Sequence, residues 1–306
     1  MNTLFIKKWV ICLPSILFLI TGCVKDDNSD CRKSCQMVIQ VLDGYNNDIT
    51  ETDVVDDVVL YLFGSESKYM DSIPIPTQSV RSRTPITINY PEHSHITAVV
   101  WCNTEGDNTI VDDVKEGDSL TTPLDINLNM EGTSGQNEIY SSPEDLFHGY
   151  KRIDMEDGGG SFTTELKVKR KISSIIVIAK HLKDWAGGGS DDEYYILVHG
   201  TRKIYSLVDG KLGEDDAIHR PDVSFDDNDY LVSSLFNTFP SGPDQRVEVE
   251  IFKGDNRIYR ASLDQNGNPF VAEEGRTLQV EIDFSGSISV NVSVNPWHVI
   301  NQYSEL

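Results

Sequence analysis

Short segments in which apolar and polar residues alternate recur along almost the whole chain. In the clearest of them, Ile288, Val290, Val292 and Val294 alternate with serine and asparagine. Successive side chains of a β-strand point to opposite faces, so this pattern gives one apolar and one polar face. Many such segments, separated by turn-forming residues and without crossover helices, predict an all-β protein built from antiparallel β-sandwiches.

The predicted strands fall into two series, separated by an acidic, glycine-rich stretch at 154–161. We therefore expect two tandem sandwich domains, at residues 36–157 and 161–306. The first series comprises strands around Val38 and Val41 and at 58–62, 95–101 and 124–130. The second comprises 163–168, 172–179, 193–198, 203–207, 230–235, 246–252, 257–263, 277–284 and 287–294. Before residue 160 the only helical signal is 142–147, where serine, proline and two acids precede an apolar pair.

Residues 1–22 have the organisation of a secretion signal. Lys7 and Lys8 precede an apolar stretch at 9–20, which is shorter than the roughly 20 residues that a membrane-spanning helix needs. Ile20, Thr21, Gly22 and Cys23 close this stretch and resemble a bacterial lipobox, with small residues before the cysteine. This resemblance predicts cleavage after Gly22 and a lipid on the Cys23 thiol.

Residues 23–35 are expected to form a lipidated, acidic tether. More than one acyl chain on Cys23 would give durable anchoring without a membrane-spanning helix. The acidic residues after Cys23 resemble a signal that sends some outer-membrane lipoproteins to the cell surface. We therefore expect a lipid-anchored protein of the outer membrane, exposed at the surface.

Three cysteines remain after the signal and the lipidated residue: Cys31, Cys35 and Cys102. An odd number allows at most one disulfide, and the sequence leaves its pairing open. Cys31 and Cys35 have no nearby histidine that would complete a zinc site. Cys102 follows an apolar segment and is expected to be a buried thiol.

The chain is strongly acidic. It has 26 Lys and Arg against 49 Asp and Glu, a formal net charge of −23. Such a chain repels phosphate backbones, which argues against nucleic acid as a partner. Oxygen-rich clusters such as 226–229 could bind calcium, but none has the EF-hand spacing, and solvated turn acids are the preferred interpretation.

Motifs for catalysis or cofactors are not found. His93 and His95 are two residues apart but lack a third metal ligand, and no nucleophile elbow, zinc-protease motif or phosphate loop occurs. We therefore predict no enzyme activity, no cofactor and no metal. Arg170 shares a strand face with Leu166 and Val168, so it should point inward and pair with a carboxylate or carbonyl groups.

Several segments, taken in order, resemble the FimB-type anchor subunits of type V fimbriae, within the fimbrillin superfamily of Gram-negative surface lipoproteins. They are the lipobox, 30–31, 57–63, 98–101, 145–149, 169–172 and 295–300. The resemblance covers most of the chain after the signal. One departure is Cys102, where family members often have glycine.

This resemblance implies two transthyretin-like β-sandwich domains, a lipid anchor in the outer membrane and no catalysis. It implies that the protein fixes the base of a fimbrial fibre, limits its length and joins pilin subunits by strand complementation. Whether the strand at 288–294 is donated or packed in cis is left open. The alternative is a surface lipoprotein that binds glycan or a host protein through exposed aromatic residues.

Overall fold

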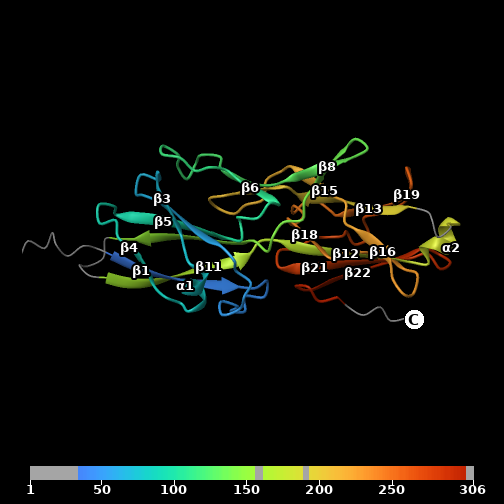
Figure 1. The fold of residues 1–306 in the computed structure, drawn as a ribbon, viewed down its shortest axis with the longest axis horizontal. Coiled ribbons are helices and arrows are strands. Elements are labelled where there is room, and N and C mark those ends of the chain that lie inside the picture. The colour runs from blue at the N-terminus through green and yellow to red at the C-terminus, as the bar shows by residue number, and fades with distance from the viewer. Residues whose placement is uncertain (1–33, 156–160, 189–192, 301–306) are drawn as a thin grey trace, which may run out of the picture.

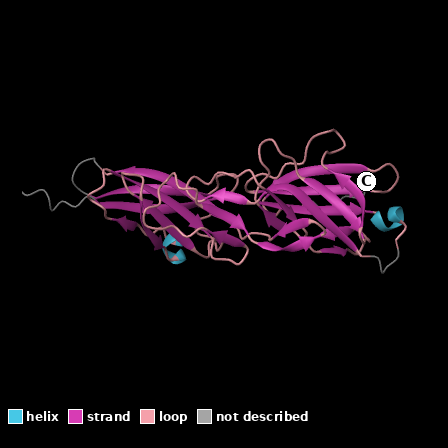
Figure 2. Ribbon diagram, turned by 90° about the horizontal axis from the view of Figure 1, so that it is seen from above, coloured by secondary structure: helices cyan, strands magenta, loops and turns pink. Residues whose placement is uncertain are grey.

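The computed structural model describes residues 34–155, 161–188 and 193–300. These residues form two β-sandwiches placed end to end along the long axis of the molecule (Figures 1 and 2). Two short helices lie at the periphery, α1 (Thr77–Arg81) and α2 (Leu182–Ala186). In the described part of the chain, no helix has the length and apolar character needed to cross a membrane.

The N-terminal half is organised around one seven-stranded sheet. Its apolar residues alternate along each strand and meet in a core that includes Leu60, Val100 and Phe147. In spatial order the strands are β3 (Tyr69–Pro74), β2 (Val58–Phe63), β5 (His95–Cys102), β10 (Phe147–Asp154), β11 (Ser161–Arg170), β1 (Ser34–Leu42) and β4 (Ile86–Ile88).

The C-terminal half encloses a second core between two larger sheets. One sheet has the order β16 (Val223–Phe225), β17 (Leu231–Ser233), β12 (Ser173–Lys180), β21 (Arg276–Asp283) and β22 (Ser289–Pro296), and β18 (Phe236–Thr238) also pairs with β12. The other has the order β15 (Asp216–His219), β13 (Tyr194–Arg202), β19 (Glu248–Lys253) and β20 (Asn256–Ala261).

A smaller sheet joins the two halves. Its strands are β14 (Ile204–Ser206), β7 (Asp125–Leu128) and β6 (Thr109–Val111), so β14 of the second half pairs with a strand of the first. A hairpin of β8 (Met130–Ser134) and β9 (Asn137–Tyr140) follows β7. A third buried cluster lies here and combines side chains of both halves, including Trp101, Tyr205 and Phe239.

The all-β fold predicted from the alternation is confirmed, with one addition. Each half contains a parallel pair, β1 with β11 and β12 with β21, within otherwise antiparallel sheets. Antiparallel neighbours can be joined by tight turns, whereas parallel neighbours need a long connection. In both halves the intervening strands provide that connection.

The helix predicted at 142–147 is wrong. Residues 141–146 are irregular, and Phe147 begins β10. The backbone groups that a helix would use bond to distant residues instead. The carbonyl of Asp145 accepts from Asn103 Nδ2 at 2.7 Å, and the carbonyl of Leu146 accepts from the Lys171 amide at 2.8 Å.

The sheet pairing differs from the predicted domain limits of 36–157 and 161–306. β11, assigned from sequence to the second domain, lies between β10 and β1 in the first sheet. The acidic, glycine-rich stretch therefore connects two neighbouring strands of one sheet. The predicted tether of 23–35 also overlaps β1, because Ser34 and Cys35 already belong to that strand.

Candidate functional site at the domain junction

A buried ion pair lies where the two halves meet. Arg170 is the last residue of β11, and its side chain is only 4% exposed. Its Nε donates to Asp145 Oδ1 at 2.6 Å and its Nη2 donates to Asp145 Oδ2 at 2.8 Å. The prediction that Arg170 points inward and finds a carboxylate is confirmed. A bidentate pair of this kind fixes both distance and orientation.

Two aromatic rings flank the Arg170 guanidinium. Its central carbon lies 5.0 Å from the centre of the Phe147 ring and 4.5 Å from that of Trp297. Trp297 follows β22, and the amide of the next residue, His298, donates to Thr277 Oγ1 at 2.8 Å. The cation thus lies within cation–π distance of two rings, which is favourable where water is excluded. This contact ties the C-terminal segment to the first sheet.

A second set of contacts crosses the junction on the β14 side. Trp101 Nε1 donates to the carbonyl of Leu207 at 2.6 Å, and its ring lies 4.6 Å from that of His148. The Tyr205 hydroxyl donates to the carbonyl of Lys171 at 2.6 Å. These bonds satisfy the polar atoms of large buried rings, so the two halves are held in one orientation.

Four of the segments that carry the family resemblance therefore converge. Those at 98–101, 145–149, 169–172 and 295–300 each contribute to the junction through Trp101, Asp145, Arg170 and Trp297. Sequence reasoning anticipated the burial of Arg170 but not its partners, because Asp145 and Trp297 lie 25 and 127 residues away. The one local signal of this site in the sequence was an arginine on an otherwise apolar strand face.

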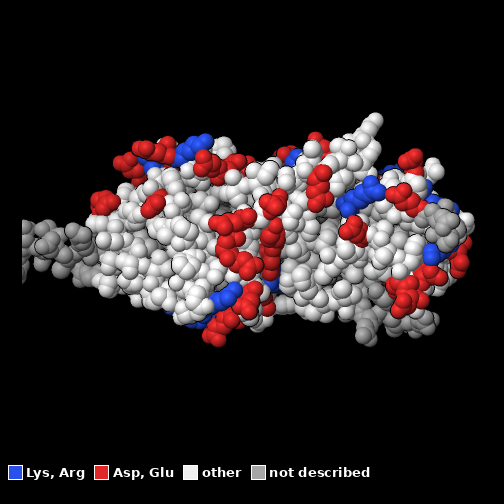
Figure 3. Space-filling model, viewed as in Figure 1, with Lys and Arg blue, Asp and Glu red and all other residues white. Residues whose placement is uncertain are grey.

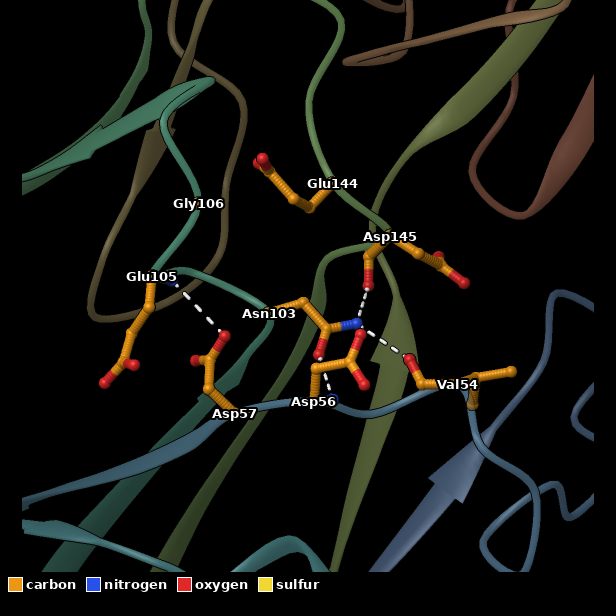
Figure 4. A pocket seen from close by; sticks show the side chains of 8 residues that line it. All are labelled: Val54, Asp56, Asp57, Asn103, Glu105, Gly106, Glu144 and Asp145. Atoms are coloured by element: carbon orange, nitrogen blue, oxygen red, sulfur yellow. Dashed lines mark hydrogen bonds between the residues drawn. The ribbon is translucent and has the colours of Figure 1, made fainter.

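An acidic pocket opens beside this junction (Figure 4). It has a volume of about 560 Å³ and is lined by Val54, Asp56, Asp57, Asn103, Glu105, Gly106, Glu144 and Asp145. The close-up shows the carbonyl of Asp145 facing Asn103 while its carboxylate points away from the pocket. Figure 3 shows acidic side chains gathered across the middle of the molecule.

Most polar groups of this pocket form hydrogen bonds to the backbone of the loops that line it. Asn103, which has a positive φ of 64°, donates from Nδ2 to the carbonyl of Val54 at 2.8 Å and accepts at Oδ1 from the Asp56 amide. The Asp57 carboxylate accepts from the amides of Thr104 and Glu105. The pocket attracts cations, but it places no nucleophile beside a base.

The other candidate ligands named from sequence are dispersed. Among the described residues, no group of three His, Cys, Asp or Glu side chains is placed to hold a metal ion. His93 Nδ1 lies 3.2 Å from the Ser65 amide, which donates to it. Asp226 accepts from the amides of Asn228 and Tyr230, as expected of a turn acid.

The cysteines divide between the described and undescribed parts of the chain. Cys35 and Cys102 are free thiols, fully buried in the N-terminal core. Burial raises the pKa of the Cys35 thiol to about 11 and also raises the pKa of Cys102, so both thiols are protonated at neutral pH. Cys31 and the lipobox residues Ile20, Thr21, Gly22 and Cys23 lie outside the described residues.

In the described part of the chain, the strongly exposed aromatic rings belong to three separate elements: a turn, β10 and α2. Tyr45, Tyr150 and Trp185 are the aromatic residues with large exposed fractions. Trp185 packs against Phe284 with ring centres 4.7 Å apart. The glycan-binding alternative therefore has no continuous stacking platform among these residues.

The comparisons with known proteins agree with one another. The family model for fimbrillin-A associated anchor proteins Mfa1 and Mfa2 matches residues 28–303. The major fimbrium anchoring subunit FimB of Porphyromonas gingivalis is 27% identical over 312 residues, covering 98% of each chain.

Two solved structures share the fold. The P. gingivalis fimbrial anchor protein Mfa2 superposes with a TM-score of 0.61 and 13% identity, covering 86% of this chain and 98% of that one. A DUF1812 protein from Bacteroides thetaiotaomicron gives a TM-score of 0.65 and 16% identity, covering 88% and 99%. Because the family model spans nearly the whole sequence, the chain belongs to the family of fimbrillin-A associated anchor proteins.

Proposed function

We propose that this protein is an outer-membrane lipoprotein that anchors the base of a fimbrial fibre. The observation that carries the proposal is the match to anchor subunits along residues 28–303. The fold is compatible with the role, because the buried junction links the two sandwiches into one elongated body that can transmit tension. The role requires no catalysis, cofactor or metal.

The proposed attachment to the membrane rests on the N-terminal sequence. Cys23 would carry the lipid, and residues 24–33 would connect it to β1, which begins at the outer end of the N-terminal half (Figure 1). More than one acyl chain would hold the protein durably in the bilayer. The acidic residues after Cys23 support a location at the cell surface.

The proposed partners are pilin subunits. Strand complementation would join them to this protein, with main-chain hydrogen bonds supplying affinity and alternate side chains supplying specificity. A subunit that is held by its lipid at the base would stop growth at that end of the fibre, which is how we propose that it limits fibre length.

Replacing Cys23 by alanine should release both the protein and its fibres from the membrane. Without the acyl chains, the favourable transfer of about 0.8 kcal/mol per buried CH₂ is lost. We expect fibres to be shed into the medium, and detergent extracts of the membranes to lose the protein together with its pilins, as measured by pull-down and mass spectrometry. Cys102→Ala serves as the matched control, because this thiol is buried in the core.

Two results would contradict the proposal. One is a wild-type protein that is extracted from native membranes without any fimbrial subunit. The other is a Cys23→Ala strain whose fibres stay attached to the cells in wild-type amounts.

A further inference from the structure

One sheet edge in the C-terminal half lacks the usual protection. β22 has eight residues and pairs only with β21. None of its residues is charged. Exposed edges normally carry charges, are very short or are covered, because free main-chain groups invite pairing with another chain.

The other edge strands of the described sheets are protected in these ways. β3 contains Asp71 and Pro74, β20 contains Arg257 and Arg260, and β15 begins with Asp216. β4, β16, β18, β6 and β14 have three residues each, and β8 and β9 each contain a glutamate. Among the described residues, β22 is therefore the longest edge strand, and it carries no charge.

The direction of the main-chain groups of β22 follows from one hydrogen bond of β21 and the register of the two strands. The Phe284 amide donates to the carbonyl of Lys180, so on β21 the even-numbered residues face β12 and the odd-numbered residues face β22. The partners of those odd residues are the odd residues of β22, including Asn291 and Ser293. The amides and carbonyls of Val292 and Val294 consequently point away from β21.

A hydrogen bond at the start of this edge confirms that the even-numbered residues of β22 face away from β21. The carbonyl of Val290 accepts a hydrogen bond from the amide of Gln265, which lies outside the sheet. No backbone bond from another described segment reaches the outward groups of Val292 or Val294. Pro296 then ends the edge, since it has no amide hydrogen to offer.

Apolar side chains are exposed beside the same edge. Ile288, Val294, Val299 and Ile300 are 38–45% exposed, and they are four of the ten large hydrophobic residues with high exposure in the described chain. Val290 and Val292, on the same face of β22 as Val294, contact the C-terminal core. The core is thus continuous with an apolar surface that ends at the open edge.

We propose that this edge receives an extended strand from a fimbrial subunit, which adds to the sheet beside Val292 and Val294. The proposal rests on the proposed anchoring function and names its contact site. Side chains of the added strand on the core face would lie next to the valines, so they should be apolar. Those on the opposite face would lie next to Asn291 and Ser293, so they should be polar and uncharged.

Charge favours a different protein over a second copy of this chain. Each copy has a formal net charge of −23, so two copies held edge to edge would repel one another. The edge itself carries no charge, so it complements a neutral strand and disfavours a charged one.

The test uses two peptides of one length as probes. One alternates valine with serine and asparagine, and in the other glutamate replaces each valine. Hydrogen exchange of the full chain should show at least tenfold slower exchange at the Val292 and Val294 amides with the first peptide, and no change with the second. In Val294→Pro the outward amide is absent while the ladder to β21 is kept, so the protection at Val292 should be lost.

Two separate lysine substitutions, one at the edge and one elsewhere, provide the test and its matched control in cells. Val294→Lys adds a charge at the edge, and Ile110→Lys adds the same charge at a residue that is 52% exposed in β6. Pull-down from native membranes should recover at least tenfold less fimbrial subunit with Val294→Lys and Val294→Pro than with wild type or Ile110→Lys. All variants should remain membrane-bound and folded by circular dichroism.

Three outcomes would overturn the proposal while leaving the anchoring function intact. Undiminished subunit recovery with Val294→Pro and Val294→Lys would show that another surface is used. A wild-type dimer that Val294→Pro converts to a monomer would identify a second copy as the occupant. Val294 amide protection in the isolated protein that disappears when residues 301–306 are deleted would identify the chain's own C-terminus. Failure of the anchoring function itself would appear as wild-type protein without subunits.

Discussion

Replacing Asp145 by alanine is expected to lower the free energy of unfolding by about 3–5 kcal/mol, because it leaves a buried guanidinium without its partner. The side chain of Arg170 is 4% exposed, and Asp145 accepts both of its bidentate hydrogen bonds. The flanking rings of Phe147 and Trp297 cannot replace a carboxylate as an acceptor. Urea denaturation of the full chain would measure the loss.

A double variant separates the lost pair from general damage. Asp145→Ala combined with Arg170→Met removes both charges, so it should recover most of the stability that Asp145→Ala alone loses. Asp154→Ala is the surface control, since its contact with Arg152 Nε is 3.2 Å long but both side chains are more than half exposed, and it should cost less than about 1 kcal/mol. A loss below about 1 kcal/mol for Asp145→Ala would show that the buried pair does not hold the junction.

Acidification from pH 6.5 to 4.5 is expected to destabilise the protein through two buried histidines. Burial lowers the pKa of His148 and of His219 to about 4, and nearby Lys171 adds to the effect at His148. Both rings are neutral in the folded state, whereas in the unfolded chain they bind protons below about pH 6.5. The unfolded state therefore gains protons first, and stability falls as the pH falls.

The change of the free energy of unfolding with pH follows from these pKa shifts. Each histidine contributes up to about 1.4 kcal/mol per pH unit between its unfolded and folded pKa values, which gives on the order of 5 kcal/mol for both over two units. Below about pH 4 the effect levels off, because the folded rings also become protonated. The low pKa of the Asp48 carboxylate, which accepts hydrogen bonds from Thr50 and Gln40, affects stability only at lower pH.

Two variants test the histidine assignment. In His148→Gln the amide nitrogen can replace Nε2, which lies 3.2 Å from the carbonyl of Val208. In His219→Asn the amide nitrogen can replace Nδ1, which lies 3.0 Å from the carbonyl of Tyr140. Each variant should reduce the slope of stability against pH by about half. An unchanged slope in the double variant would assign the acid sensitivity to other groups.

Both predictions concern the contact between the two halves, which is also what the proposed anchor depends on. His148 lies against Trp101, and Asp145 holds Arg170 beneath Trp297. Loss of either contact would loosen the junction before it unfolds either sandwich, because each half has its own core. The pull of a fibre would then bend the molecule at this point.

Local pattern alone determined much of the architecture. The alternation at 277–284 and 287–294 predicted β21 and β22 to within about two residues, because side-chain direction repeats every two residues along one strand. The inward direction of Arg170 followed from the same repeat. The targeting signal and Cys23 are also read from neighbouring residues alone, and they stay predictions.

The intramolecular partners of strands and backbone groups were decided only by the tertiary structure. Ser142 to Phe147 carry a helix-start pattern, yet Phe147 begins β10, because Asn103 and Lys171 bond the backbone that a helix would need. β11 reads as the start of a second domain, yet it pairs with β1 about 127 residues earlier.

The open edge of β22 shows the same division. The alternation along β22 predicted which of its side chains share a face. Only the pairing with β21 determined which of its main-chain groups remain free. Strand formation depends on residues two apart, whereas strand order depends on contacts between residues far apart in sequence. The sequence therefore determined the strands of this protein, and the tertiary structure determined its junction and its open edge.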